Sequence, residues 1–161
     1  MKIDKHNIIT LLDENNQDVV GEFLSQLSKE SQYTEEAKLH LMFLHSAFNL
    51  LSVQPLENLI NTMTEITIIL NGHSRTKRYE LVKPLKVIPI YELRYAMNQN
   101  EHLRFLFFPF QYKGESNYIF VKYFKKTWNP TVDETNEMRD LTYQMYKRVQ
   151  LNPEFYLEGT D

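Results

Sequence analysis

The sequence predicts an α+β domain in which N-terminal helices pack on a small antiparallel sheet of three to four strands, followed by one C-terminal helix. Two observations support this fold class. Apolar residues recur at helical spacing in the first third of the chain, and aromatic strand-like runs follow residue 90. A length of 161 residues fits one domain, and an apolar content of 42% can fill its core. The absence of cysteine excludes a disulfide scaffold, thiol catalysis and thiolate metal sites.

The first third of the chain is expected to hold one short strand and two helices. Ile8–Leu12 is a short apolar run that ends at a polar turn, as a first strand would. Asp18 can cap a helix whose apolar residues reach Leu27, because its carboxylate can accept from free backbone N–H groups. Thr34 precedes a second helix with a wide apolar face, which predicts that this helix is well buried.

A helical insertion is expected around residues 52–78. Pro55 favours a helix start, and Leu56, Leu59 and Met63 fit one helical face. The run Thr64–Leu70 is rich in β-branched residues, so a strand is the alternative there. In the helical interpretation, Gly72 provides a left-handed turn at the helix C-terminus.

The second half of the chain is expected to supply the sheet. Strands are predicted at about Ile90–Met97, Leu103–Gln111 and Asn117–Lys125. The last two are joined by a short polar turn, which predicts an antiparallel hairpin, and the apolar faces of the middle strand predict a central position. A last helix is expected to begin near Pro130, where Thr131 and Glu134 have the spacing of a capping box.

Basic residues are concentrated in the part of the chain that is predicted to form the sheet. The net charge is −3, yet residues 73–126 contain 11 Lys and Arg against 4 Asp and Glu. Cations set among aromatic rings suit a single-stranded polyanion, because the cations meet phosphates while the rings stack on bases. The alternative is that lysines only solvate strand edges and block aggregation.

Two arginines and three lysines are the main candidates for a phosphate site. The planar forks of Arg94 and Arg104, on neighbouring predicted strands, suit a phosphate, although Arg94 could instead pair with a glutamate two residues away. Lys122 alternates with aromatic residues on the last strand and could stabilise developing phosphate charge. Lys125 and Lys126 at the end of that strand could bind the nucleic-acid backbone.

Other residue types provide weaker candidates. Tyr95 and Tyr123 could stack on bases or transfer protons, although most strand tyrosines are packing residues. Arg78 lies in a basic connector and is a candidate RNA contact, while His73 and His102 could act as acid or base near neutral pH. No glycine-rich phosphate loop and no metal-binding histidine motif is found, so neither a cofactor nor a metal is expected.

The order of three segments resembles the RelE/HigB-type toxins of bacterial toxin–antitoxin systems, especially their phage-derived relatives. A Glu-Leu-Arg strand at Tyr91–Arg94 precedes an Arg-bearing aromatic strand at Arg104–Phe108. The strand Phe120–Thr127 contains Phe-Lys-Lys, and the helix after it carries Glu134 and Arg139. The resemblance covers about residues 91–148 well, and more loosely the first strand and first helix.

The resemblance implies a metal-independent endoribonuclease that cuts mRNA, often on the ribosome, by attack of the ribose 2′-hydroxyl on the phosphodiester. Carried over, Arg94, Arg104, Lys122 and Tyr123 would be catalytic, and Lys125, Lys126, Arg78 and Tyr95 would contact RNA. The implied partner is an antitoxin of helix-turn-helix type. A cytoplasmic location is expected, since no signal peptide or membrane span is recognised.

Two alternatives remain open at the level of the sequence. Toxins of this family are usually strongly basic, whereas this chain is acidic, so it could be a non-catalytic phage-related protein of the same fold that binds a protein partner. It could also be a plain single-stranded nucleic-acid binder that uses the aromatic and basic hairpin as its platform.

Overall fold

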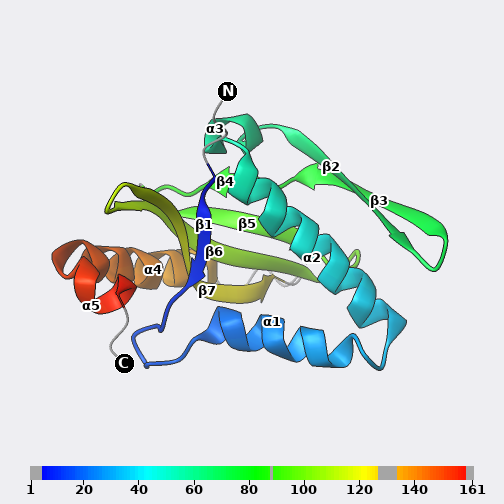
Figure 1. Cartoon of the computed structure of the whole chain (residues 1–161), viewed down its shortest axis with the longest axis horizontal. Helices are drawn as coiled ribbons and strands as arrows, with labels where there is room; N and C mark the ends of the chain where they lie inside the picture. The colour runs from blue at the N-terminus through cyan, green and yellow to red at the C-terminus, as the bar shows by residue number, and fades with distance from the viewer. Residues whose placement is uncertain (1–4, 88, 127–133, 159–161) are drawn as a thin grey trace.

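A computed structural model describes residues 5–87, 89–126 and 134–158 of the chain (Figure 1). Its helices are α1 (Val19–Glu30), α2 (Glu35–Val53), α3 (Leu56–Leu59), α4 (Glu134–Leu151) and α5 (Pro153–Leu157). Its strands are β1 (Asn7–Thr10), β2 (Met63–Leu70), β3 (His73–Glu80), β4 (Val82–Pro84), β5 (Tyr91–Ala96), β6 (His102–Tyr112) and β7 (Glu115–Lys126). The α+β class predicted from the sequence is therefore confirmed.

The main sheet has five strands in the order β1-β7-β6-β5-β4, with β6 at its centre. Strands β4 to β7 are antiparallel to their neighbours, whereas β1 runs parallel to β7. The expected antiparallel sheet of three to four strands is therefore found in β4 to β7, but β1 adds a fifth strand in the parallel direction and makes the sheet mixed. A four-residue strand at the start of the chain does not reveal its distant partner, so the direction of β1 could not be predicted locally.

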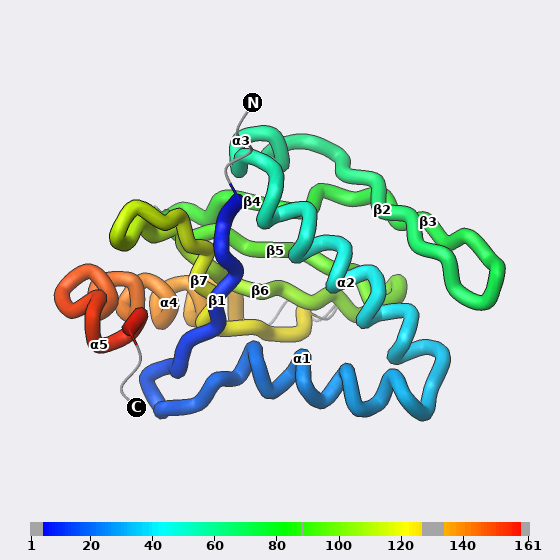
Figure 2. Tube along the Cα trace, in the orientation of Figure 1, coloured from blue at the N-terminus to red at the C-terminus, as the bar shows by residue number. Residues whose placement is uncertain are grey.

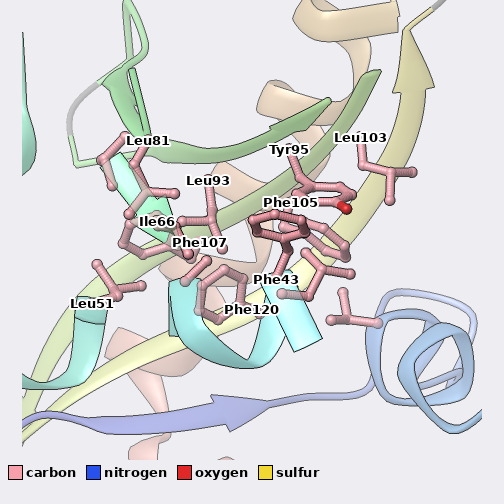
Figure 3. Packing of buried hydrophobic residues seen from close by; sticks show 14 of the residues in the cluster. Phe43, Leu51, Ile66, Leu81, Leu93, Tyr95, Leu103, Phe105, Phe107 and Phe120 are labelled. Atoms are coloured by element: carbon pink, nitrogen blue, oxygen red, sulfur yellow. The ribbon is translucent and has the colours of Figure 1, made fainter. Parts of the chain in front are cut away.

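Helices cover both faces of this sheet (Figures 1 and 2). Helices α1 and α2 and the β2–β3 hairpin share one apolar core with one face, and α4 packs on the other face. Large rings fill the first core, as Figure 3 shows for the buried side chains Phe43, Tyr95, Phe105, Phe107 and Phe120. Because β6 is buried on both sides, its two-sided apolar pattern was read correctly as a central strand.

Local signals at the helix starts were also read correctly. Asp18 Oδ1 accepts a hydrogen bond from the backbone N–H of Gly21 at 2.9 Å, which caps α1. Thr34 Oγ1 accepts from the N–H of Ala37 at 3.1 Å and caps α2 in the same way. The capping box predicted at Thr131 lies outside the described residues, which resume with α4.

The helical insertion expected around residues 52–78 is wrong, because most of this segment is a β-hairpin. Only the four-residue helix α3 forms after α2, and β2 then alternates between exposed and buried residues along its whole length. Asn71 and Gly72 both have positive φ, at 52° and 78°, as the central residues of a tight hairpin turn require. Gly72 therefore turns a hairpin and does not end a helix.

A β-bulge in β7 changes which side chains share a face with Lys122. The pairing register with β6 shifts between Leu106 and Phe107, so the residues that follow are offset by one. As a result Phe120 packs in the core beside α2, while Phe124 packs in the core beside α4. Of these two phenylalanines, only Phe124 shares a face with Lys122. Simple alternation along the strand, which places Phe120 on that face as well, is therefore misleading here.

Candidate functional site

Three cationic side chains and one histidine lie together at one end of the sheet, on the face opposite α1 and α2. In the strand register, Arg94 of β5 is paired with Arg104 of β6, and His102 of β6 is paired with Lys126 of β7. These four residues, here called the cationic cluster, lie on one face because they alternate in step along their strands. Lys126 is exposed, Arg94 and His102 are partly exposed, and Arg104 is buried.

Two carboxylates offset part of this charge. The buried carboxylate of Glu92 lies 3.6 Å from Nε of Arg94 and 3.6 Å from Nε of Arg104. Glu80 adds a second contact to Arg94 at 3.5 Å. All three distances exceed those of good N–H···O hydrogen bonds, so the glutamates balance charge without saturating the guanidinium donors. This arrangement leaves guanidinium N–H groups that could donate hydrogen bonds to a phosphate oxygen.

The surroundings of the cationic cluster shift the pKa of two of its members. Partial burial lowers the pKa of His102, and the positive charges of Arg104, Arg94 and Lys126 lower it further. His102 is therefore neutral at pH 7 and available to accept a proton. Burial beside Arg94 lowers the pKa of Arg104 to about 10, so its guanidinium stays charged at neutral pH.

Lys122 lies apart from the cationic cluster in a buried ion pair. Its Nζ is 2.9 Å from Oδ2 of Asp13 and 2.7 Å from Oε1 of Glu14, both in the loop between β1 and α1. Burial lowers the pKa of Lys122, but its bonds to Glu14 and Asp13 outweigh burial and raise that pKa overall. Both contacts bind this loop to β7, which is a structural role.

Replacing Lys122 with methionine is expected to lower the free energy of unfolding by about 3 kcal/mol, because buried Asp13 would lose its cationic partner and keep only its hydrogen bonds from backbone N–H groups. The matched variant Lys126→Met removes an exposed lysine from the same strand and should change stability by less than about 0.5 kcal/mol. Urea unfolding of both variants measures this difference. Equal stabilities would show that the Lys122 ion pair contributes little.

Tyr95 is not an RNA-stacking platform, contrary to the expectation from the sequence. Its ring is fully buried in the core shown in Figure 3. Its hydroxyl oxygen lies 2.6 Å from Nδ1 of His40 on α2. Lys77 donates to the same hydroxyl at 3.2 Å, and burial raises the pKa of Tyr95. Stacking on a base needs an accessible ring face, which this environment does not provide.

Tyr123 points away from the cationic cluster. Its ring packs against Phe23 of α1, with ring centroids 4.7 Å apart, on the face opposite Arg94 and Arg104. It lines a groove of about 420 Å³ formed by α1, β7 and Met138 of α4. The structure therefore does not bring Tyr123 together with the arginines that the sequence grouped with it.

The remaining candidates lie on three different elements, β7, β3 and α4. Lys125 is exposed beside Glu101, with 3.8 Å between the charged atoms, and its neighbour Lys126 belongs to the cluster. Arg78 is exposed on β3, where it is paired in register with Glu65 of β2. On α4, Arg139 donates to Asn136 at 2.7 Å and to Asp140 at 3.1 Å.

The sequence did not reveal that His102 and Glu80 lie beside the two arginines. His102 was named as an acid–base residue only from its position in a turn, and Glu80 was not singled out at all. Both depend on which residues face one another across strands, which no short motif encodes. Among residues 5–87, 89–126 and 134–158, no group of three or more His, Asp or Glu side chains is arranged to hold a metal ion.

Comparisons with known proteins identify no relative of this chain. No family model, no curated protein and no solved structure matches it. In the part of the chain that the structure describes, no helix is both long and apolar enough to cross a membrane.

Proposed function

We propose that this protein is an RNA-cleaving toxin of the RelE/HigB type, with the cationic cluster as its phosphate site. The order of elements supports this proposal: a first strand, two helices, the strands β5, β6 and β7, and a last helix follow the order of the resemblance. The β2–β3 hairpin is then the insertion between the helices and those strands. The chain would form one RelE-like domain.

The pairing of Arg94 with Arg104 is the observation that carries the proposal. Two guanidinium groups in register on adjacent strands repel each other, and Glu92 contacts both at distances too long for strong hydrogen bonds. A phosphodiester would add negative charge beside the two guanidinium groups. It would also accept hydrogen bonds from their remaining N–H groups. Arg94 and Lys126 would contact it directly, while buried Arg104 would add positive charge from below.

In the proposed reaction the ribose 2′-oxygen forms a bond to phosphorus while the bond from phosphorus to the 5′-oxygen breaks. Neutral His102 accepts the proton of the 2′-hydroxyl, and the departing 5′-oxygen takes a proton from solvent. The guanidinium groups stabilise the charge that grows on the phosphoryl oxygens during the attack. The products are a 2′,3′-cyclic phosphate and a 5′-hydroxyl, and no metal enters this scheme.

Expression in a bacterial host that lacks the partner gene tests this function. Wild-type protein is expected to arrest growth and to fragment mRNA, and Arg94→Ala/Arg104→Ala should relieve both effects. Lys38→Ala, which removes an exposed lysine of α2 on the opposite face of the sheet, is the control that should remain toxic. Normal growth and intact mRNA with soluble, folded wild-type protein would contradict the proposal.

A second candidate is a non-catalytic protein of the same fold that binds a protein partner or single-stranded nucleic acid. It is favoured by the buried ion pair of Lys122 and the buried ring of Tyr95, since two residues expected at the RNA site serve packing instead. The net charge of −3 also weakens general attraction to RNA. Under both candidates the proposed partner is an antitoxin of helix-turn-helix type. Salt-sensitive RNA binding that leaves the RNA intact would favour the non-catalytic candidate over the toxin.

A further inference from the structure

One edge of the β2–β3 hairpin borders a groove on the flank of α2. β2 pairs with β3 along one side, and no other strand of the described chain pairs with its second side. Three consecutive β2 residues, 67–69, line this groove of about 470 Å³. Consecutive side chains of a strand point to opposite faces, so a groove along one face would be lined by every second residue. A groove lined by three consecutive residues therefore lies along the edge of the strand. The opposite wall is formed by Leu41, Met42, His45 and Ser46 of α2.

The free edge of β2 carries few of the residue types that usually protect an edge strand, although α2 flanks it across the groove. Proteins commonly protect such edges with several charges, prolines or bulges. The segment Met63–Leu70 contains only one charged residue, Glu65, and no proline. Its outward side chain Ile69 is 68% exposed. An apolar, β-branched strand with unprotected backbone groups is suited to receive another strand.

Charge determines which strand could add to this edge. β3 carries Arg75, Lys77 and Arg78, so two copies of β3 paired antiparallel would place like charges opposite each other. Two copies of β2 can pair antiparallel without like charges meeting. When Thr67 pairs with Thr67 of the second copy, the single carboxylate of each strand lies opposite an apolar residue. In that register Glu65 faces Ile69, and Ile66 faces Ile68.

We propose that two copies of this chain dimerise by antiparallel pairing of their β2 edges about a two-fold axis at Thr67. The two hairpins then form one continuous four-stranded sheet, with the same surface used by both copies. The apolar flank of each α2, with Leu41 and Met42, faces the corresponding flank across the axis and covers the groove. The hairpin, which extends beyond the main sheet in Figure 2, is thus an assembly element.

Introducing a charge at the two-fold axis tests the proposal. Thr67 is exposed and faces its own copy, so Thr67→Lys and Thr67→Glu should each weaken the dimer by at least about tenfold. An equimolar mixture of the two variants should restore a dimer, because opposite charges then meet. Light scattering and sedimentation of the full chain over a concentration series measure each state.

Thr76→Lys is the matched control, since Thr76 is the cross-strand neighbour of Thr67, with hydroxyl oxygens 2.8 Å apart, but lies on β3. It should leave the dimer unchanged. A wild-type protein that stays monomeric up to about 100 µM would overturn the proposal, because the affinity would be too weak to matter. A dimer that resists both Thr67 variants, or that Thr76→Lys also disrupts, would place the interface elsewhere.

Discussion

Glu92→Gln is expected to lower the free energy of unfolding by about 3 kcal/mol, and phosphate is expected to restore part of that loss. The substitution keeps the shape of the side chain but removes the negative charge that Arg94 and Arg104 share at 3.6 Å. Two guanidinium groups would then face each other across adjacent strands with Glu80 as the remaining acidic contact to Arg94. A bound anion replaces the lost charge and stabilises the folded state by mass action.

Urea unfolding with and without inorganic phosphate at constant ionic strength measures both effects. Glu101→Gln is the matched control, because it removes a half-exposed carboxylate that lies 3.8 Å from Lys125, and it should cost less than about 1 kcal/mol. Phosphate should stabilise Glu92→Gln more than either the control or the wild type. A destabilised Glu92→Gln variant that phosphate does not rescue would argue that the cationic cluster is closed to anions.

Local chemistry explains which parts of the fold were predictable. The caps at Asp18 and Thr34 involve groups three residues apart, so the sequence pattern contains the complete interaction. The hairpin at Asn71 and Gly72 also had a local signal, since this dipeptide favours a tight turn between strands. The helical spacing from Leu56 to Met63 points instead to a helix, although only four residues there form one.

Long-range pairing explains what the sequence did not provide. The ion pair between Lys122 and Asp13 joins residues 109 positions apart, and β1 pairs with β7 over a similar separation, as Asn7 with Asn117 shows. The bulge in β7 then reverses the faces of the residues around Val121, so alternation placed Lys122 beside the wrong aromatic neighbour. Strand propensity locates the strands, whereas register decides which of their side chains meet.

The same distinction applies to the candidate site. Arg94 and Arg104 were grouped correctly, because both belong to strong strand patterns that are adjacent in sequence. Tyr95 and Tyr123 have similar patterns but point to the opposite face, into the core beneath α1 and α2. An acidic chain can therefore still present a local cationic surface, since strand alternation sorts charges between faces independently of net charge.

His102→Gln is expected to reduce the rate of RNA cleavage by roughly 10²–10⁴-fold, the usual contribution of a general base. Its imidazole must be neutral to accept the 2′-hydroxyl proton, and the lowered pKa of His102 keeps it neutral at pH 7. The wild-type rate should therefore rise with pH through a pKa below 6.5 and level off near neutrality. His73→Gln, an exposed histidine of the β2–β3 hairpin, is the matched control and should retain wild-type activity.

The charge environment of His102 gives a second, independent test of this role. Lys126→Gln removes one of the positive charges that lower the pKa of His102, so the acidic limb of the rate profile should move to higher pH. NMR titration of the His102 ring should report the same displacement without any substrate. A displaced NMR titration with an unmoved rate profile would confirm the electrostatics and remove His102 from the reaction, leaving the cationic cluster as a binding site.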